Sequence, residues 1–329
     1  MKYAYYPGCS LEKNAAAYGD SFRAVTDVLS QELVELEDWN CCGATEYFSL
    51  DPLPAYALLA RNLALVPQGL TDLVAPCSAC YLNLYKTEHH MAEHPQLNSD
   101  VNTALAEAHL SYKPGTVRVR NALDILVKDV GYEQIAAHVK QPLRGLRLAP
   151  YYGCLVVRPG GLGTDNPEYP DALDRLLETL GATVVDFPLK AACCGGHMPQ
   201  INPETAYALI YELVSAAAAR EADAIITLCP MCQLNLDVYQ TQANDHFGTH
   251  HSMPVLYFTQ MMGLAFGLSS QAMGFGQEFV SAQPLLDKLA SPPPPPEEEP
   301  KKKPQRSKKA LPMPRMIETG DREREGSRA

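Results

Sequence analysis

The ten cysteines of this 329-residue chain follow one pattern that occurs twice. In each copy a single cysteine comes first, a vicinal pair followed by glycine comes next, and a Cys-x-x-Cys motif comes last. The first copy consists of Cys9, Cys41, Cys42, Cys77 and Cys80, and the second consists of Cys154, Cys193, Cys194, Cys229 and Cys232. A repeat of about 150 residues is too long for a solenoid, and it indicates two homologous domains or two halves of one pseudo-symmetric domain.

Thiolate sulfur is a soft ligand that suits zinc, copper(I) and iron–sulfur clusters. A structural zinc ion takes four ligands, and a cubane [4Fe–4S] cluster takes four thiolates, commonly from a dense run of cysteines. Each copy of the pattern offers five thiols and only one Cys-x-x-Cys motif. The spacing therefore favours an iron–sulfur site that is larger or less regular than a cubane. The alternative is structural zinc, with one idle cysteine in each copy, or buried inert thiols.

Composition and charge limit the other functions. Hydrophobic residues make up 46% of the chain, enough for real cores, and the formal net charge of -11 argues against a nucleic-acid-binding surface. The N-terminus does not resemble a secretory signal, and no run of about 18 apolar residues could span a bilayer. These features predict a cytoplasmic protein that reaches a membrane only through a partner. A reducing compartment disfavours disulfides, and this also indicates that the cysteines bind metal or take part in redox chemistry.

The cysteines follow segments that are typical of short β-strands. Strands are expected at residues 2–8, 33–36 and 72–75 in the first copy and at 146–149, 182–187 and 224–228 in the second. Helices are expected at residues 14–31, 52–66, 79–94, 168–181, 203–219, 231–245 and 257–267. This alternation predicts an α/β fold of two pseudo-symmetric βαβ-type repeats with parallel sheets. Every thiol then lies at the carboxyl end of a strand, where open α/β sheets bind ligands.

The chain divides into four segments. The first cysteine-rich repeat spans residues 1–97, and residues 98–145 form a connector that is expected to be helical as far as residue 140. The second repeat spans residues 146–268, and a C-terminal extension covers residues 269–329. From about residue 291 a run of prolines and blocks of charge replace the apolar residues. Such a composition cannot bury a core, so it predicts a disordered tail.

The duplicated cysteine pattern resembles the family of B-type subunits of heterodisulfide reductases, proteins with a duplicated cysteine-rich CCG domain. The resemblance covers residues 1 to about 268, and all ten cysteines fall in register. It implies that each repeat holds one noncubane [4Fe–4S] cluster on its five cysteines. It also implies an oxidoreductase that acts on a sulfur group and reduces, or forms, a disulfide such as CoM-S-S-CoB between the two clusters.

The electrons for such a reaction must come from outside the chain. The sequence holds neither a GxGxxG motif for a flavin or nicotinamide nor a ferredoxin-type cysteine run. The resemblance therefore implies a complex with a ferredoxin-like iron–sulfur subunit, similar to the C-type subunit of heterodisulfide reductases, and a flavoprotein electron source. The alternative is an electron-transfer or membrane-docking subunit of a succinate or fumarate dehydrogenase or another flavin oxidoreductase. Such a complex would place the chain peripherally at the inner face of the membrane.

Further residues are candidates for the site. His197 follows the second vicinal pair and is a candidate proton donor to a product thiolate, the alternative being a surface loop histidine. Arg158 and Lys190 flank the second motif and would hold an anionic substrate group, or would be ordinary solvated charges. Residues 159–163 lack the lysine and hydroxyl of a phosphate-binding loop and are interpreted as a rim of the crevice. The apolar helix expected at 257–267 is either packed in the core or a docking surface.

Overall fold

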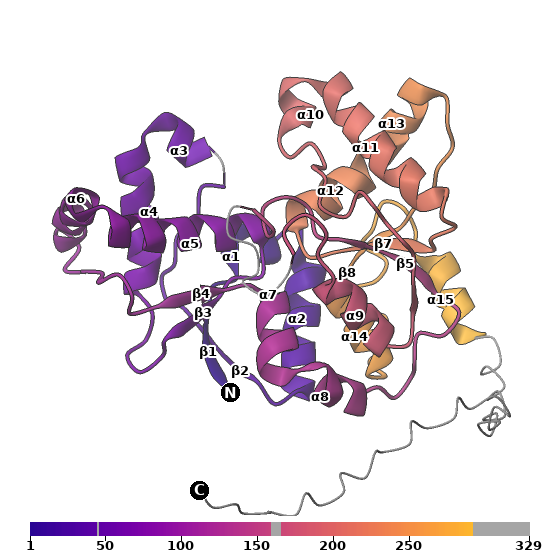
Figure 1. Cartoon of the computed structure of the whole chain (residues 1–329), viewed down its shortest axis with the longest axis horizontal. Coiled ribbons are helices and arrows are strands. Elements are labelled where there is room, and N and C mark those ends of the chain that lie inside the picture. Colours follow the sequence, from indigo (N-terminus) through magenta and orange to yellow (C-terminus); the bar gives the residue numbers. More distant parts are fainter. Residues whose placement is uncertain (45, 159–165, 292–329) are drawn as a thin grey trace, which may run out of the picture. The chain divides into compact units, whose positions relative to one another are not determined.

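Two four-stranded parallel β-sheets organise the chain, one in each half (Figure 1). The computed structural model describes residues 1–44, 46–158 and 166–291. The tail predicted from about residue 291 and the loop at 159–163 lie outside the described residues. The strand order is β2-β1-β3-β4 in the first sheet and β6-β5-β7-β8 in the second, and all neighbouring strands are parallel. The matching order confirms the predicted α/β fold with two pseudo-symmetric repeats.

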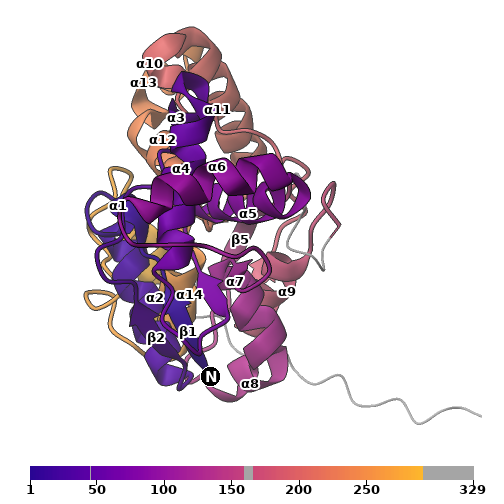
Figure 2. The same cartoon turned by 90° about the vertical axis from the view of Figure 1, so that its left-hand side faces the viewer.

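Strands and helices alternate along the chain. The first half contains the strands β1 (Lys2–Tyr5), β2 (Glu32–Glu35), β3 (Asp72–Val74) and β4 (Arg118–Arg120) and the helices α1 (Gly8–Leu11), α2 (Ala16–Val28), α3 (Glu46–Leu50), α4 (Pro52–Ala64), α5 (Ser78–Glu93), α6 (Pro95–Ala106), α7 (Ala122–Ile125), η1 (Leu126–Val130) and α8 (Tyr132–Ala137). The second half contains the strands β5 (Arg147–Tyr151), β6 (Thr183–Val184), β7 (Ala224–Thr227) and β8 (Val255–Tyr257) and the helices α9 (Ala172–Thr179), α10 (Met198–Ile201), α11 (Pro203–Ala218), α12 (Pro230–Val238), α13 (Gln240–Phe247), α14 (Phe258–Ala265) and α15 (Gln283–Ala290). In the first half α4, α5 and α6 pack against one another (Figure 2).

Local sequence signals set several helix ends. The side chain of Asp51 accepts a hydrogen bond from the backbone N–H of Leu53 at the start of α4. Asn202 accepts one from the backbone N–H of Thr205 at the start of α11. Both helices begin with proline, which has no N–H to leave unpaired in the first turn. Gly248 ends α13 with a φ of +65°, in the left-handed region that favours glycine.

The sequence-based prediction missed the fourth strand of each sheet. β4 lies inside the segment that is predicted to be helical, and β8 ends at Tyr257, the first residue of the last predicted helix. Both strands have only three residues, which is too short for a period of two to be recognised. Arg120 of β4 is nevertheless buried, because it is paired with Asp124 and Asp129 of the following helical turns. The helix predicted at 231–245 is also wrong in detail, since it is divided into α12 and α13.

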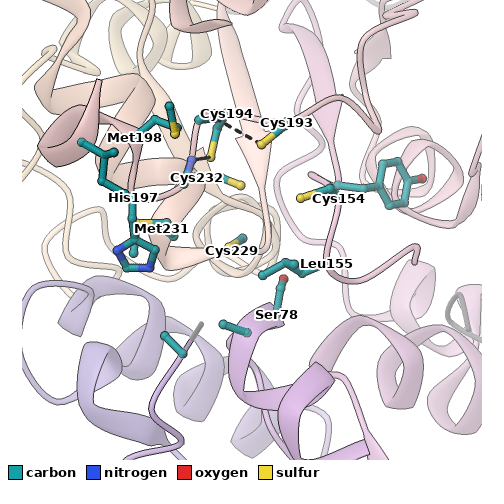
Figure 3. A pocket seen from close by; sticks show the side chains of 16 residues that line it. Ser78, Cys154, Leu155, Cys193, Cys194, His197, Met198, Cys229, Met231 and Cys232 are labelled. Atoms are coloured by element: carbon teal, nitrogen blue, oxygen red, sulfur yellow. Dashed lines mark hydrogen bonds between the residues drawn. The ribbon is translucent and has the colours of Figure 1, made fainter. Parts of the chain in front are cut away.

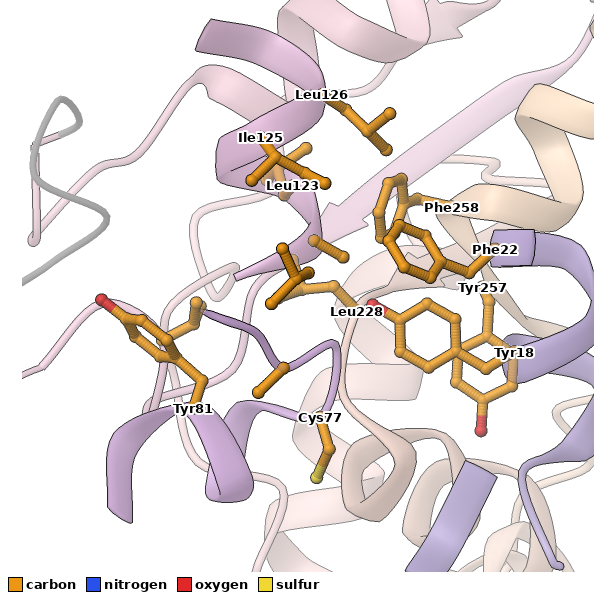
Figure 4. Packing of buried hydrophobic residues seen from close by; sticks show 14 of the residues in the cluster. Tyr18, Phe22, Cys77, Tyr81, Leu123, Ile125, Leu126, Leu228, Tyr257 and Phe258 are labelled. Atoms are coloured by element: carbon orange, nitrogen blue, oxygen red, sulfur yellow. The ribbon is translucent and has the colours of Figure 1, made fainter. Parts of the chain in front are cut away.

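The two halves are joined by the packing of α2 against α14 (Figure 4). The rings of Tyr18 and Tyr257 are stacked, with centroids 4.5 Å apart and an interplanar angle of 6°. Beside them the buried hydroxyls of Ser21 and Thr259 share a hydrogen bond of 2.6 Å. All eight residues of α14 are buried. This apolar helix is therefore packed in the core and is not a docking surface.

Removal of one hydroxyl of the Ser21–Thr259 pair should weaken the joint between the halves. Ser21→Ala leaves the buried Thr259 hydroxyl without this partner, and we expect the free energy of unfolding to fall by about 1–3 kcal/mol. Thr259→Val should cost less, because the Ser21 hydroxyl still donates to the carbonyl of Tyr18 at 3.2 Å. The double variant should recover part of the lost free energy of unfolding, because it contains no buried hydroxyl without its partner. Denaturant titration measures these differences, and equal losses in the two single variants would contradict this interpretation.

Candidate functional site

All ten cysteines lie beyond the carboxyl ends of strands. Cys9 and Cys154 follow β1 and β5, and the vicinal pairs follow β2 and β6. The Cys-x-x-Cys motifs follow β3 and β7, at the starts of α5 and α12. Because the strands of each sheet are parallel, the three loops of each half meet at one edge of its sheet. The structure thus brings the five cysteines of each set to a common edge.

In the first half hydrogen bonds link the five thiols in a series. Cys9 Sγ lies 3.6 Å from Cys41 Sγ, and Cys42 Sγ lies 3.1 Å from Cys80 Sγ. Cys9 is exposed, whereas Cys42, Cys77 and Cys80 are buried. Hydrogen bonds from the thiols of Cys41 and Cys80 lower the pKa of Cys42 to about 4. This environment favours the thiolate form of Cys42, the form that binds metals.

The second half has a comparable arrangement. Cys193 is exposed, Cys154 is half-buried, and Cys194, Cys229 and Cys232 are buried. A hydrogen bond from the Cys154 thiol lowers the pKa of Cys193 to about 6. A hydrogen bond from the Cys232 thiol lowers the pKa of Cys229 to about 7. Each half thus contains at least one readily ionised sulfur in contact with a second thiol.

Glycine keeps space beside one sulfur of each set. A Cβ atom on Gly8 would lie 2.9 Å from Cys80 Sγ, and a Cβ atom on Gly153 would lie 2.9 Å from Cys232 Sγ. The two glycines have φ angles of +73° and +68°, which residues with a side chain rarely adopt. The equivalent position in both halves shows that backbone packs directly against the sulfur atoms, and only glycine permits this approach.

Backbone N–H groups also point at the sulfurs of the vicinal pairs. Gly43 N–H donates to Cys41 Sγ at 3.4 Å, and Gly195 N–H donates to Cys193 Sγ at 3.4 Å. Such donors stabilise negative charge on sulfur. The glycine that follows each vicinal pair in the sequence is thus part of the environment of the thiols in both halves.

Two asparagines that were not among the predicted site residues hold the loops of the vicinal pairs. Asn83 on α5 donates to the carbonyl of Cys42 at 3.1 Å, and Asn235 on α12 donates to the carbonyl of Cys194 at 3.2 Å. Both asparagines are buried. Each lies three residues after the second cysteine of a Cys-x-x-Cys motif, in the pattern Cys-x-x-Asn. This repeated asparagine is a signal that a comparison of the two copies would have found.

A cavity of about 270 Å³ opens beside the second set of thiols (Figure 3). We call it the thiol-lined cavity, because its lining includes Cys154, Cys193, Cys194, Cys229 and Cys232. The first half contributes Ala44, Ser78 and Ala79 to the lining, and the cysteines of the first set are not among the described lining residues. Most other walls are apolar, among them Leu155 and Met231. The cavity is therefore a largely apolar space at the boundary between the two halves.

His197 lines the thiol-lined cavity, and its Nε2 atom lies 3.3 Å from Oε1 of Glu46 in the first half. The imidazole is partly exposed, with 35% of its side-chain surface accessible to solvent. The sequence-predicted candidate is thus in the site rather than on a remote loop. Its ring also forms a polar contact between the two halves.

The two cations that were candidates for anion binding are already paired. The exposed Arg158 guanidinium lies 3.4 Å from Oε2 of Glu168. Lys190 is buried, with Nζ 2.6 Å from Oδ1 of Asp174 and 3.9 Å from the ring centroid of Tyr169. The interpretation of Lys190 as a solvated charge is wrong, and its buried ion pair also removes it as a free anion-binding group.

Two further properties concern the described part of the chain. Within residues 1–44, 46–158 and 166–291, no group of three or more His, Cys, Asp or Glu side chains has the arrangement of a single-ion metal site. The thiols of each half are instead linked to one another by hydrogen bonds. In these same ranges no helix combines the length and the apolar character needed to cross a bilayer.

Several characterised proteins are similar to this chain over most of its length. The 8-methylmenaquinol:fumarate reductase membrane anchor subunit of Wolinella succinogenes is 33% identical over 86% of this chain and 99% of the relative. The B-type subunit of the ferredoxin/F(420)H(2)-dependent CoB-CoM heterodisulfide reductase of Methanosarcina acetivorans is 31% identical over 88% of this chain and 97% of the relative. A protein of Archaeoglobus profundus that is named as similar to the B-type subunit of heterodisulfide reductase is 30% identical over 82% of this chain and 92% of the relative.

A hypothetical protein from Helicobacter pylori has a similar fold in its crystal structure, with a TM-score of 0.69 and 14% identity. The similarity covers 85% of this chain, which spans only about half (52%) of that protein. Residues 3–85 and 148–237 each match the cysteine-rich domain CCG, one match in each half. The two matches include all ten cysteines. The chain therefore belongs to the cysteine-rich CCG domain family, with the domain present twice.

Proposed function

We propose that the chain is the catalytic cysteine-rich subunit of a heterodisulfide reductase-like complex, which reduces a disulfide or forms one in the reverse direction. The observation that carries this proposal is the thiol-lined cavity of about 270 Å³, whose lining contains all five cysteines of the second set. A cluster on these five cysteines would occupy the part of the cavity among their sulfurs, and the rest of the lining, which includes Ala44, Ser78 and Ala79 of the first half, supports access of a small molecule to the reacting centre. The relatives from Methanosarcina and Archaeoglobus, at 31% and 30% identity, support the same class.

We assign one noncubane [4Fe–4S] cluster to the five cysteines of each half. The donor set suits iron and sulfide, because five soft sulfur ligands gather at one edge of each sheet. Gly8 and Gly153 leave room beside a sulfur in each half, and the N–H groups of Gly43 and Gly195 stabilise thiolate charge. A bound cluster of this kind supplies single electrons and a soft Lewis acid for thiolate sulfur.

The proposed reduction consumes two electrons and two protons, breaks one S–S bond and yields two thiols. A ferredoxin-like iron–sulfur subunit, itself reduced by a flavoprotein, is the proposed electron donor. The chain's own residues would hold the substrate between the cluster site and the first-half wall around Ser78, and the apolar walls exclude water. His197, in the lining, is the proposed donor of one proton from its imidazole to a product thiolate.

A second candidate is an electron-transfer or membrane-docking subunit of a fumarate reductase-like flavin complex. The relative from Wolinella succinogenes, a membrane anchor subunit at 33% identity, is the observation that favours it. In this role the chain would be peripheral at the inner face of the membrane through its partners. For the leading candidate we propose a cytoplasmic location. The two candidates differ in whether a thiol or disulfide reaches the clusters.

Iron analysis and electron paramagnetic resonance together test the proposed function. Anaerobically purified protein should contain about eight iron atoms and about eight acid-labile sulfides per chain, enough for two four-iron clusters. After oxidation, its resonance signal should change on addition of 2-mercaptoethanol, because the thiol enters the thiol-lined cavity. Zinc without sulfide would contradict the redox assignment. A full complement of iron with a signal that no thiol changes would favour the electron-transfer candidate.

A substitution at Gly153 should affect the second site selectively. We expect Gly153→Ala to reduce the iron content from about eight to about four atoms per chain, because the added Cβ would lie 2.9 Å from Cys232 Sγ. Gly248→Ala is the matched control, since Gly248 has a similar φ of +65° but a Cβ there would meet nothing within 4 Å. Iron analysis and circular dichroism of both variants measure the effect. Equal iron loss in the two variants would attribute it to backbone strain instead of crowding at sulfur.

A further inference from the structure

The hydroxyl of Ser78 is a buried polar group that lacks an ordinary partner. Ser78 follows Cys77 and begins α5 in the first half. Only 1% of its surface is exposed, and within the described part of the chain its Oγ atom makes no hydrogen bond of normal geometry. Most buried hydroxyls in folded proteins have a partner, because an unpaired one costs free energy. This hydroxyl is therefore available to an acceptor in its surroundings.

Ser78 faces the second set of thiols, although it belongs to the first half. It lines the thiol-lined cavity together with Cys229, and Figure 3 shows its oxygen directed into the cavity on the side of Cys229. The largest cause of the lowered pKa of Cys229 is the Cys232 thiol, and the nearby Ser78 hydroxyl adds a smaller contribution in the same direction. The sulfur of Cys229 is therefore the acceptor within reach of this hydroxyl.

The equivalent position of the second half carries no such donor. The residue after the first cysteine of the Cys-x-x-Cys motif is Ser78 in one copy and Pro230 in the other. Both residues begin a helix, α5 in the first half and α12 in the second. Proline has neither a hydroxyl group nor an N–H group. At this position a donor of the first half thus faces a sulfur of the second half, and the reverse contact does not exist.

We propose that Ser78 donates a hydrogen bond to Cys229 Sγ in the cluster-loaded protein, and that this bond makes the second cluster easier to reduce than the first. The inference rests on the proposed function, because it needs a cluster in each half. Reduction adds negative charge to a cluster and its thiolates, and a donor at a ligand sulfur stabilises the more negative state. Ser78 is a positioning residue in this role, since it acts through Cys229. It favours reduction in the half whose thiols line the cavity.

Redox titrations followed by electron paramagnetic resonance test this inference on the anaerobically purified full chain. In the wild type the second cluster should have the higher reduction potential. Ser78→Ala should lower that potential by about 59 mV, equal to a tenfold change in the one-electron equilibrium between the clusters, and should leave the first cluster unchanged. Ser78→Thr keeps the hydroxyl and should retain most of the wild-type potential. Cys232→Ala removes a ligand of the second set, so the signal that it changes identifies the second cluster.

Thr87→Val is the matched control. Thr87 is fully buried on the same helix and its hydroxyl is equally unpartnered, but it is not among the described residues that line the thiol-lined cavity. This variant should leave both potentials unchanged.

The outcomes separate the inference from the proposed function. Two clusters with no shift in Ser78→Ala, or with an equal shift in Thr87→Val, overturn the role of Ser78 and leave the proposed function intact. A lower potential for the second cluster than for the first in the wild type also overturns it, so the test does not depend on the folding of any Ser78 variant. If the wild type lacks two clusters, the proposed function fails and the inference fails with it.

Discussion

The contact between α2 and α14 is the constraint on which the rest of the site depends. Each parallel sheet gathers its own cysteines, but the cavity beside the second set is completed by Ser78 and Ala79 of the first half. Those residues reach it only because the halves are held in one orientation. The stacked rings of Tyr18 and Tyr257 and the buried hydroxyl pair fix that orientation, since both interactions require a specific geometry as well as burial.

The two halves have the same structural features around their sulfur atoms. Glycine with a positive φ lets the backbone approach a thiol, an N–H group points at each vicinal pair, and an asparagine on the helix after the Cys-x-x-Cys motif holds the vicinal loop. The N–H groups favour the thiolate form, which costs free energy in a buried setting unless donors surround it. Both halves therefore stabilise ionised sulfur at the edge of the sheet by the same local arrangement.

Away from the sulfurs the halves differ in what they contribute. The thiols of the second half line the thiol-lined cavity, whereas the first half supplies Ala44, Ser78 and Ala79 to its wall. Lys190, which precedes the vicinal pair of the second half, is instead buried against Asp174. An internal duplication thus supplies two equivalent sets of thiols, and residues outside the duplicated motif make the surroundings of one set different from those of the other.

The sequence by itself determined the two sets of cysteines, the alternation of strands and helices and the parallel sheets, because these follow from local patterns and from spacing that repeats within the chain. A comparison of the two sequence copies would also have identified Asn83 and Asn235 from their equal spacing. Only the tertiary structure decided that Arg120 lies in a fourth strand, that Lys190 is buried and paired, and that His197 lines the thiol-lined cavity. Each of these outcomes depends on contacts between residues far apart in the chain, and hydrophobic periodicity carries no information about which charges will find a partner.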